Sequence, residues 1–176
     1  MRLLRVVLPL ILLLSSAVAL GKGTYLTLPQ LLNDWFPAGQ EARTLWLSTE
    51  QKDLAREHIR YDLRQARVKY WAHNGKNLWV LSEIGKEKPI TFAVLTHNGV
   101  LERIEVMVFR EIRGDEIRLP AFTAQFAQLK LTGNGELSGN IDGISGATYS
   151  VRSMEKVAKL ALLLDRWAAT PDENLH

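Results

Sequence analysis

Alternating apolar and polar positions dominate the middle of the chain. Residues 65–73 alternate, Asn74-Gly75 follows, and a second apolar run covers residues 78–84. Residues 89–110 repeat this arrangement around a second Asn-Gly pair. A period of two indicates strands, and Asn-Gly suits the two-residue turn of a hairpin. The pattern therefore predicts two hairpins, which give four antiparallel strands with one face in water.

Helical spacing of apolar residues appears on either side of these hairpins. Residues 27–36 place apolar side chains three and four positions apart, and Ser48 opens a capping box for a second helix that runs toward His58. Residues 120–129 suit a short helix, and residues 151–169 have the pattern of a long amphipathic helix. The predicted fold class is α+β: an antiparallel sheet of hairpins with short N-terminal helices and a long C-terminal helix.

The first twenty residues have the layout of a secretory signal peptide. Arg2 and Arg5 precede an apolar run, and Ala17-Val18-Ala19 has the small residues of a cleavage site. The apolar stretch from Val6 to Leu20 is shorter than the roughly twenty residues of a membrane-spanning helix, so we expect cleavage after residue 19. The alternative is an uncleaved anchor helix. In both cases the rest of the chain is expected outside the cytoplasm, in the periplasm.

Composition removes several classes of protein. The 176 residues include 47% hydrophobic and 23% charged residues, which is typical of a globular chain. The absence of cysteine excludes disulfides, thiolate metal sites and catalytic thiols, and the four histidines lack metal-ligand spacing, so no metal site is expected. Residues 1–19 hold two of the 22 basic residues and no acid, which leaves 20 basic against 19 acidic residues after cleavage. A nearly neutral mature chain gives no reason to expect a nucleic-acid partner.

Five of the twelve glycines lie between Gly133 and Gly146, in a loop that leads directly into the last predicted helix. The loop ends with Asp-Gly-Ile-Ser-Gly-Ala-Thr-Tyr-Ser, residues 142–150. Glycines let the backbone fold tightly, and a helix N-terminus favours a phosphate. Two interpretations stay open from these residues alone. Either an anion binds here, with a hydroxyl as its neighbour or its covalent ester partner, or Thr148 or Ser150 simply caps the helix.

Residues 142–150 resemble the flavinylation motif of the FMN-binding domain family, which includes the periplasmic flavin subunits of the sodium-pumping NADH:quinone oxidoreductase and of the Rnf complex. That motif is an acidic residue followed by Ser/Thr-Gly-Ala-Thr-any-Ser/Thr, and residues 145–150 satisfy all of it. Chance alone gives this pattern in on the order of one in a thousand chains of this length. The resemblance implies that a magnesium-dependent flavin transferase takes FMN from FAD and joins it to Ser150 through a phosphoester bond. The family acceptor is more usually threonine, and serine offers the same oxygen without the methyl group.

The resemblance also implies roles for the rest of the motif. Gly143 and Gly146 would let the backbone approach the phosphate, and the following helix would offset part of its charge. Asp142 would hold the loop or assist the transferase when the metal is present. Tyr149, or one of the five tryptophans, could lie against the isoalloxazine ring, although packing is the commoner role of such residues. The remaining expected members of the cofactor site are Ser145, Ala147 and Thr148.

These expectations combine into an exported electron-transfer flavoprotein that relays electrons between a membrane donor and an extracytoplasmic acceptor. It would be a carrier without catalytic residues of its own, and itself the substrate of the transferase. We expect a signal peptide over residues 1–19, helices and the first hairpin over residues 20–85, and the FMN-binding domain over residues 86–170. Two alternatives stay open: a non-redox binding or assembly module, and a flavin enzyme with non-covalent FMN.

Overall fold

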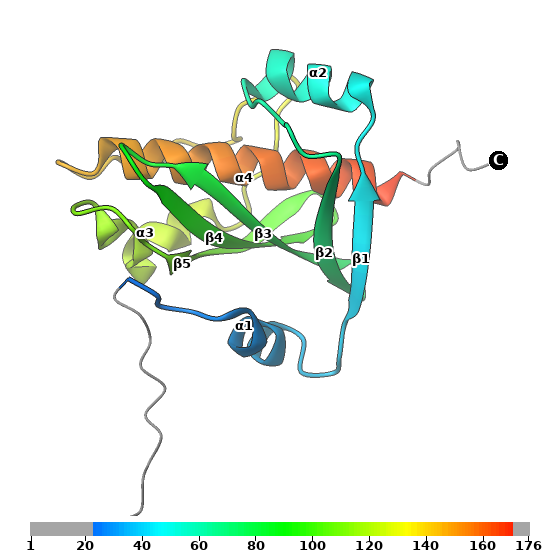
Figure 1. Cartoon of the computed structure of the whole chain (residues 1–176), viewed down its shortest axis with the longest axis horizontal. Coiled ribbons are helices and arrows are strands. Elements are labelled where there is room, and N and C mark those ends of the chain that lie inside the picture. The colour runs from blue at the N-terminus through cyan, green and yellow to red at the C-terminus, as the bar shows by residue number, and fades with distance from the viewer. Residues whose placement is uncertain (1–22, 171–176) are drawn as a thin grey trace, which may run out of the picture.

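A five-stranded antiparallel sheet forms the centre of the protein in a computed structural model that describes residues 23–170 (Figure 1). The predicted signal peptide, residues 1–19, lies outside the described residues. The strands follow one another in the sheet in chain order: β1 (Glu41–Trp46), β2 (Arg67–His73), β3 (Lys76–Ile84), β4 (Pro89–His97) and β5 (Val100–Val108). The predicted α+β class and the four strands of the two hairpins are confirmed, and β1 is an additional strand.

Both hairpin turns form at the Asn-Gly pairs. Asn74 and Gly75 have φ values of 48° and 78°, and Asn98 and Gly99 have φ values of 52° and 76°. A two-residue turn with both central residues at positive φ matches the right-handed twist of the flanking strands. The turns therefore set the register, which brings His73 opposite Lys76 in the first hairpin.

The long helix α4 (Thr148–Ala169) covers one face of the sheet. Its apolar side, including Met154 and Leu160, packs in one buried cluster with inward-facing strand residues such as Trp79 and Phe92. The helix α2 (Thr49–Ile59) contacts α4 and lies on the side away from the sheet, so that α4 is sandwiched between α2 and the strands (Figure 1). Burial on both sides explains why α4 is apolar over much of its circumference.

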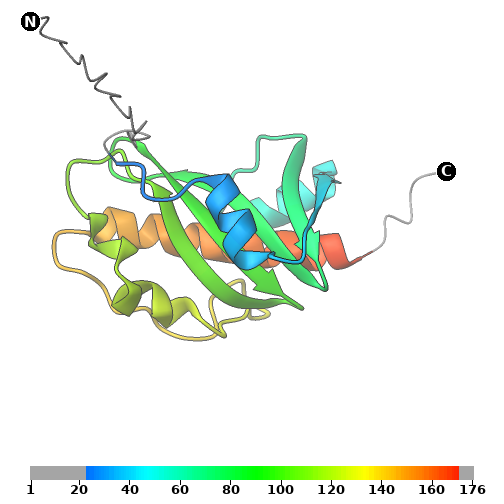
Figure 2. The same cartoon turned by 90° about the horizontal axis from the view of Figure 1, so that it is seen from below.

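The helix α1 (Leu28–Trp35) covers the opposite face of the sheet (Figure 2). Thr27 caps it in a capping box with Gln30, and Leu31 and Phe36 pack in a second buried cluster with residues of β3, β4 and β5. The expectation that one face of the sheet lies in water is therefore wrong for the central strands. Within residues 23–170, no helix is long and apolar enough to span a bilayer.

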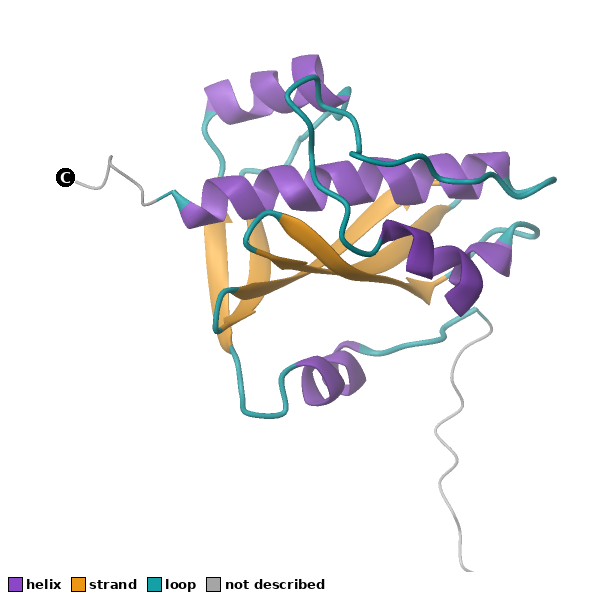
Figure 3. Cartoon of the chain, turned by 180° about the vertical axis from the view of Figure 1, so that it is seen from behind, coloured by secondary structure: helices purple, strands orange, loops and turns teal. Residues whose placement is uncertain are grey.

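Short helices and the glycine-rich loop connect β5 to α4 (Figure 3). The short helix predicted over residues 120–129 is present as α3 (Pro120–Thr123) and the 3₁₀ turn η2 (Ala124–Phe126), preceded by η1 (Asp115–Arg118). The loop then passes the end of α2, where a Cβ on Gly135 would collide with the His58 carbonyl oxygen. It returns along α4 to the first turn of that helix (Figure 3).

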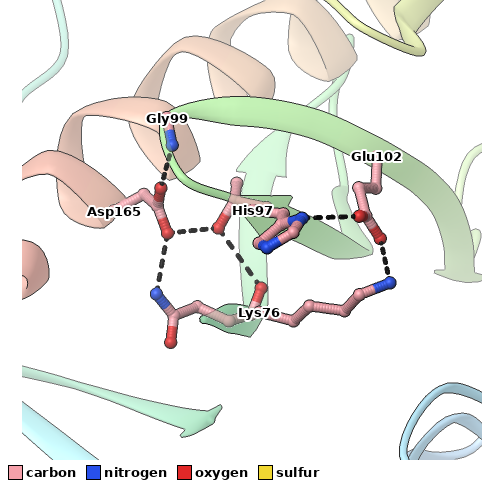
Figure 4. A network of polar contacts seen from close by, with 7 residues as sticks. Lys76, His97, Gly99, Glu102 and Asp165 are labelled. Atoms are coloured by element: carbon pink, nitrogen blue, oxygen red, sulfur yellow. Dashed lines mark hydrogen bonds and ion pairs between the residues drawn. The ribbon is translucent and has the colours of Figure 1, made fainter. Parts of the chain in front are cut away.

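A buried carboxylate fixes the C-terminal end of α4 to the hairpins (Figure 4). Asp165 accepts hydrogen bonds from the Thr96 hydroxyl at 2.6 Å and from the Asn77 side-chain amide at 2.8 Å. Its other oxygen accepts one from the Gly99 backbone N–H at 2.8 Å. The Trp79 indole N–H donates to Thr96 at 2.9 Å. This network holds α4 in a defined position along the sheet.

Candidate functional site

The helix α4 begins without a side-chain cap. Gly146, at φ +83°, turns the chain, and Ala147 occupies the N-cap position with no side-chain hydrogen bond. Thr148 is the first helical residue, three positions before the predicted start at residue 151. Thr148 and Ser150 therefore lie inside the first turn and do not cap the helix. An uncapped first turn leaves backbone N–H groups without intrahelical partners, which is the arrangement that binds anions.

Ser150 is buried, with 3% of its surface exposed, in this first turn. No residue between 23 and 170 makes a hydrogen bond with its hydroxyl. The described residues also contain no side-chain oxygen or nitrogen that is both fully enclosed and unpaired. The Ser150 oxygen must therefore be reached from the cleft that this residue lines. A hydroxyl with no internal partner is available for a bond to something outside the chain.

Gly114 forms the surface against which Ser150 lies. It follows β5 at φ +91°, and a Cβ at this position would stand 2.6 Å from the Ser150 hydroxyl oxygen and 3.3 Å from the Ala147 Cα. Any other residue would be strained at this φ and would also collide with the motif. The glycine therefore lets the turn after β5 close against the start of α4.

The cleft beside Ser150 has a volume of about 470 Å³. Its walls come from three segments far apart in the sequence, namely residues 86–87, 111–113 and 146–150. Lys86 and Arg113 bring positive charge to these walls, whereas Glu87 and Glu111 bring negative charge. Neither cation forms an ion pair with any described residue, so both cations and the helix N-terminus are available to an anion in this cleft.

Glu111 ties two walls of the cleft together. Its carboxylate accepts hydrogen bonds from the backbone N–H groups of Glu87 at 2.7 Å and of Lys88 at 2.9 Å. Burial alone raises the pKa of the Glu111 carboxyl, but these backbone hydrogen bonds outweigh burial and hold the pKa below its ordinary value. The ionised form of Glu111 therefore holds the turn between β3 and β4, and with it Lys86, next to the motif.

Two large apolar side chains flank the cleft. Tyr149 is 54% exposed and Ile112 is 87% exposed, and both line it. None of the five tryptophans, all of which lie in the described part, does so. Exposed side chains of this kind beside an anion site suit the apolar faces of a planar ring. Tyr149 is therefore the one aromatic residue among the predicted candidates that the structure places at this cleft.

The structure divides most of the predicted site residues between two hollows. Gly146, Ala147, Thr148, Tyr149 and Ser150 line the first cleft. Gly143 and Ser145, again with Thr148, line a second hollow of about 390 Å³. Asp142 lines neither, and its backbone N–H donates to the Gln125 side chain at 2.8 Å.

The second hollow also has its own charged residues. Arg152 and Glu155 line it from α4, and burial raises the pKa of the Glu155 carboxyl, against the opposing effect of Lys159. Within residues 23–170 no three His, Asp or Glu side chains are grouped so that they could hold a metal ion.

Five lining residues of the first cleft were missed from the sequence, namely Lys86, Glu87, Glu111, Ile112 and Arg113, together with Gly114 behind Ser150. The four charged residues resemble those of any solvated turn, so composition does not single them out. The glycine was the one available indication, because a glycine between elements predicts a turn.

The unpaired hydroxyl, the uncapped helix start and the two cations without ion pairs among the described residues are features that suit an anionic ligand. The comparison with protein families specifies the class. Residues 85–163 match the FMN-binding domain, and this match implies that the protein binds flavin. A comparison with curated proteins gave no match. The residues present fit the phosphate end of FMN, since the cleft offers a hydroxyl, positive charge and free backbone donors at one place.

Proposed function

We propose that the protein is an exported electron-transfer flavoprotein that carries FMN through a phosphoester bond on Ser150. The observation that carries this proposal is the Ser150 hydroxyl, which has no hydrogen-bond partner among residues 23–170 and belongs to a residue that lines a cleft at an uncapped helix N-terminus. The family match over residues 85–163 supplies the identity of the cofactor as FMN.

The attachment reaction is a transfer from FAD to the hydroxyl. The Ser150 oxygen attacks the phosphorus of the FMN half of FAD, the pyrophosphate bond breaks, and AMP leaves. The hydroxyl loses its proton, so the chain gains the mass of FMN less one water. We propose that a magnesium-dependent flavin transferase performs this step, as the resemblance of residues 142–150 to the flavinylation motif implies.

Several residues of the cleft would then hold the product in place. Lys86, Arg113 and the start of α4 offset the charge of the phosphodiester. Tyr149 and Ile112 line the cleft with exposed side chains and would offer apolar contacts to the ring. Bound FMN supplies the redox chemistry that no side chain of this chain provides.

Export explains why a covalent tether is useful. In the periplasm a dissociated flavin would be lost by dilution, whereas a phosphoester bond keeps it on the protein. The predicted signal peptide over residues 1–19 and the absence of cysteine support a bound cofactor as the electron carrier. We propose that the donor lies in the membrane and that the acceptor lies on the extracytoplasmic side.

Intact-mass analysis of protein made together with a flavin transferase tests the proposal. The wild-type chain is expected to gain the mass of FMN less water, Ser150→Thr to keep this gain and Ser150→Ala to lose it. Ser153→Ala is the matched control, because it removes the next hydroxyl along the same helix, which is engaged with the Ile84 carbonyl at 2.9 Å. A wild-type chain without the added mass refutes covalent attachment. Yellow protein without added mass would indicate non-covalent FMN, and colourless protein a non-redox module.

A further inference from the structure

Three of the five tryptophans lie under a cation. The Arg67 guanidinium stands 5.4 Å from the centre of the Trp46 ring, and the Lys69 ammonium stands 5.4 Å from that of Trp71. The third pair is Arg103 over Trp35 at 5.5 Å. A cation over an indole face is attracted by the ring, so each pair keeps its charge close to an apolar surface.

These pairs lie on the face of the sheet away from α4. Trp35 and Trp71 pack against the cluster under α1, and the register places Trp46 opposite Arg67 and Ala42 opposite Trp71 on β1 and β2. Side chains alternate along a strand, so Trp46, Arg67, Lys69 and Trp71 project from the same face. We call these four residues the tryptophan–cation face.

The tryptophan–cation face is exposed, and its charges are not neutralised. Trp46 is 58% exposed. Arg67 and Lys69 are also exposed, and neither forms an ion pair with any residue between 23 and 170. Trp71 is half-buried. The face therefore offers aromatic rings beside two positive charges that have no ion-pair partner among the described residues.

We propose that the tryptophan–cation face docks the protein on a bilayer that contains anionic lipids. Tryptophan favours the boundary between headgroups and hydrocarbon, where its ring is half apolar and half polar. Lysine and arginine are drawn to the negative surface potential of anionic headgroups. Tryptophan beside unpaired cations is the combination of residues that a bilayer with anionic headgroups attracts.

This docking leaves the flavin site free. Strands β1 and β2 lie beside the C-terminal end of α4, where Arg43 and Tyr70 share a cleft with Ala168, whereas Ser150 lies in the first turn of the same helix (Figure 1). The protein can therefore rest on the membrane while the Ser150 cleft stays open to a partner. The proposal does not depend on whether Ser150 carries FMN.

Binding of the exported protein to lipid vesicles tests the proposal. We expect sedimentation with vesicles of phosphatidylglycerol and phosphatidylcholine in equal parts, and weaker sedimentation with phosphatidylcholine alone or at high salt. Arg67→Gln with Lys69→Gln is expected to weaken binding roughly 25-fold, because each cation near an anionic surface contributes about a factor of five. The matched control is Lys52→Gln with Arg60→Gln, which removes the same charge from α2 on the other side of the molecule and is expected to bind as the wild type does.

Quenching of tryptophan emission by lipids brominated near the headgroup reports contact at the face itself, whatever else brings the chain to the vesicle. We expect quenching in the wild type, much less in Trp46→Phe, and wild-type quenching in Trp167→Phe, since Trp167 packs against the core on the α4 side. Equal vesicle binding by the Arg67/Lys69 variant and its control, with unchanged quenching in Trp46→Phe, would overturn the proposal. Failure of the wild type to bind anionic vesicles would also overturn it, and would leave the face to an acidic protein partner.

Discussion

The two ends of α4 each bury a polar side chain to the same degree, but only one of these side chains has hydrogen-bond partners among the described residues. Asp165 near the C-terminal end and Ser150 in the first turn both have 3% of their surface exposed. Asp165 accepts three hydrogen bonds, from Thr96, Asn77 and Gly99 (Figure 4). Ser150 has no hydrogen-bond partner among residues 23–170 and borders a cleft. Burial alone therefore does not distinguish a structural polar residue from a functional one.

Hydrogen-bond partners distinguish Asp165 from Ser150, and the reason is energetic. A carboxylate near a helix C-terminus is opposed by the helix dipole, so Asp165 can stay buried only because three donors compensate it. A serine hydroxyl without an internal bond contributes nothing to folding that a methyl group would not. The proposed attachment of FMN would explain its position, and the two ends of one helix would then differ in role: Asp165 for stability and Ser150 for chemistry.

The largest expected effect on the free energy of unfolding is at Asp165, near the C-terminal end of α4. Asp165→Ala leaves the Thr96, Asn77 and Gly99 donors without their acceptor, so we expect the free energy of unfolding to fall by about 3 kcal/mol. Urea unfolding measures this change. Asp34→Ala, which removes an exposed carboxylate from α1, is the control and should change the free energy of unfolding by less than about 0.5 kcal/mol.

The same variant also tests whether the two ends are independent. The Asp165→Ala protein that remains folded should carry as much FMN as the wild type, because Ser150 lies at the other end of α4. Loss of FMN attachment in folded Asp165→Ala would show that the hydrogen bonds of Asp165 also position Ser150. The two ends of α4 would then not be independent.

Gly114→Ala disturbs the first turn of α4 by placing a methyl group against Ser150. We expect a loss of about 2 kcal/mol of unfolding free energy, since the φ of +91° is strained for alanine and the new Cβ would stand 2.6 Å from the hydroxyl oxygen. We also expect slower flavin attachment, measured as added mass against time. Gly39→Ala has the same backbone strain at φ +96° with nothing within 4 Å of the new Cβ, so it isolates the collision. Equal behaviour of the two variants would remove Gly114 from the site.

Glu111→Gln has a smaller effect, and its sign depends on pH. The carboxyl has a lowered pKa in the folded protein, so its contribution is present above the ordinary glutamate pKa and is lost as pH falls through the folded value. At neutral pH we expect Glu111→Gln to lower the free energy of unfolding by about 1 kcal/mol. Thermal unfolding at a series of pH values should show the two proteins converging below about pH 4. A difference that grows in acid would contradict the ionised bond to the backbone.

Sequence periodicity predicted the elements that bury a clear stripe and missed the one that does not. The hairpin strands alternate because one side packs on α4, and their Asn-Gly turns are unambiguous. In β1 only Leu45 is buried, and Glu41 pairs with Arg43 in solvent, so no alternation marks it as a strand. Its pairing with β2 is a tertiary event that local pattern does not encode.

Only a part of the site was predicted, and the reason is similar. The motif residues are contiguous, so the sequence indicated Ser150 and its neighbours, whereas the opposite wall comes from residues 86–87 and 111–113. These segments meet the motif only because β3, β4 and β5 pair in register and Glu111 holds the backbone at residues 87–88. The start of α4 was placed too late because threonine, tyrosine and serine are weak helix formers, and tertiary packing overrides that preference.

Location of the added mass within the chain tests whether Ser150 is the acceptor of FMN. Trypsin is expected to release residues 131–152 as one peptide, bounded by Lys130 and Arg152, which contains every hydroxyl of the motif. Fragmentation of this peptide from flavinylated protein should place the FMN phosphate on Ser150, the buried hydroxyl without a partner among the described residues. FMN phosphate on Ser145 or Thr148, which are exposed residues of the same motif, or a peptide without FMN would contradict attachment at Ser150.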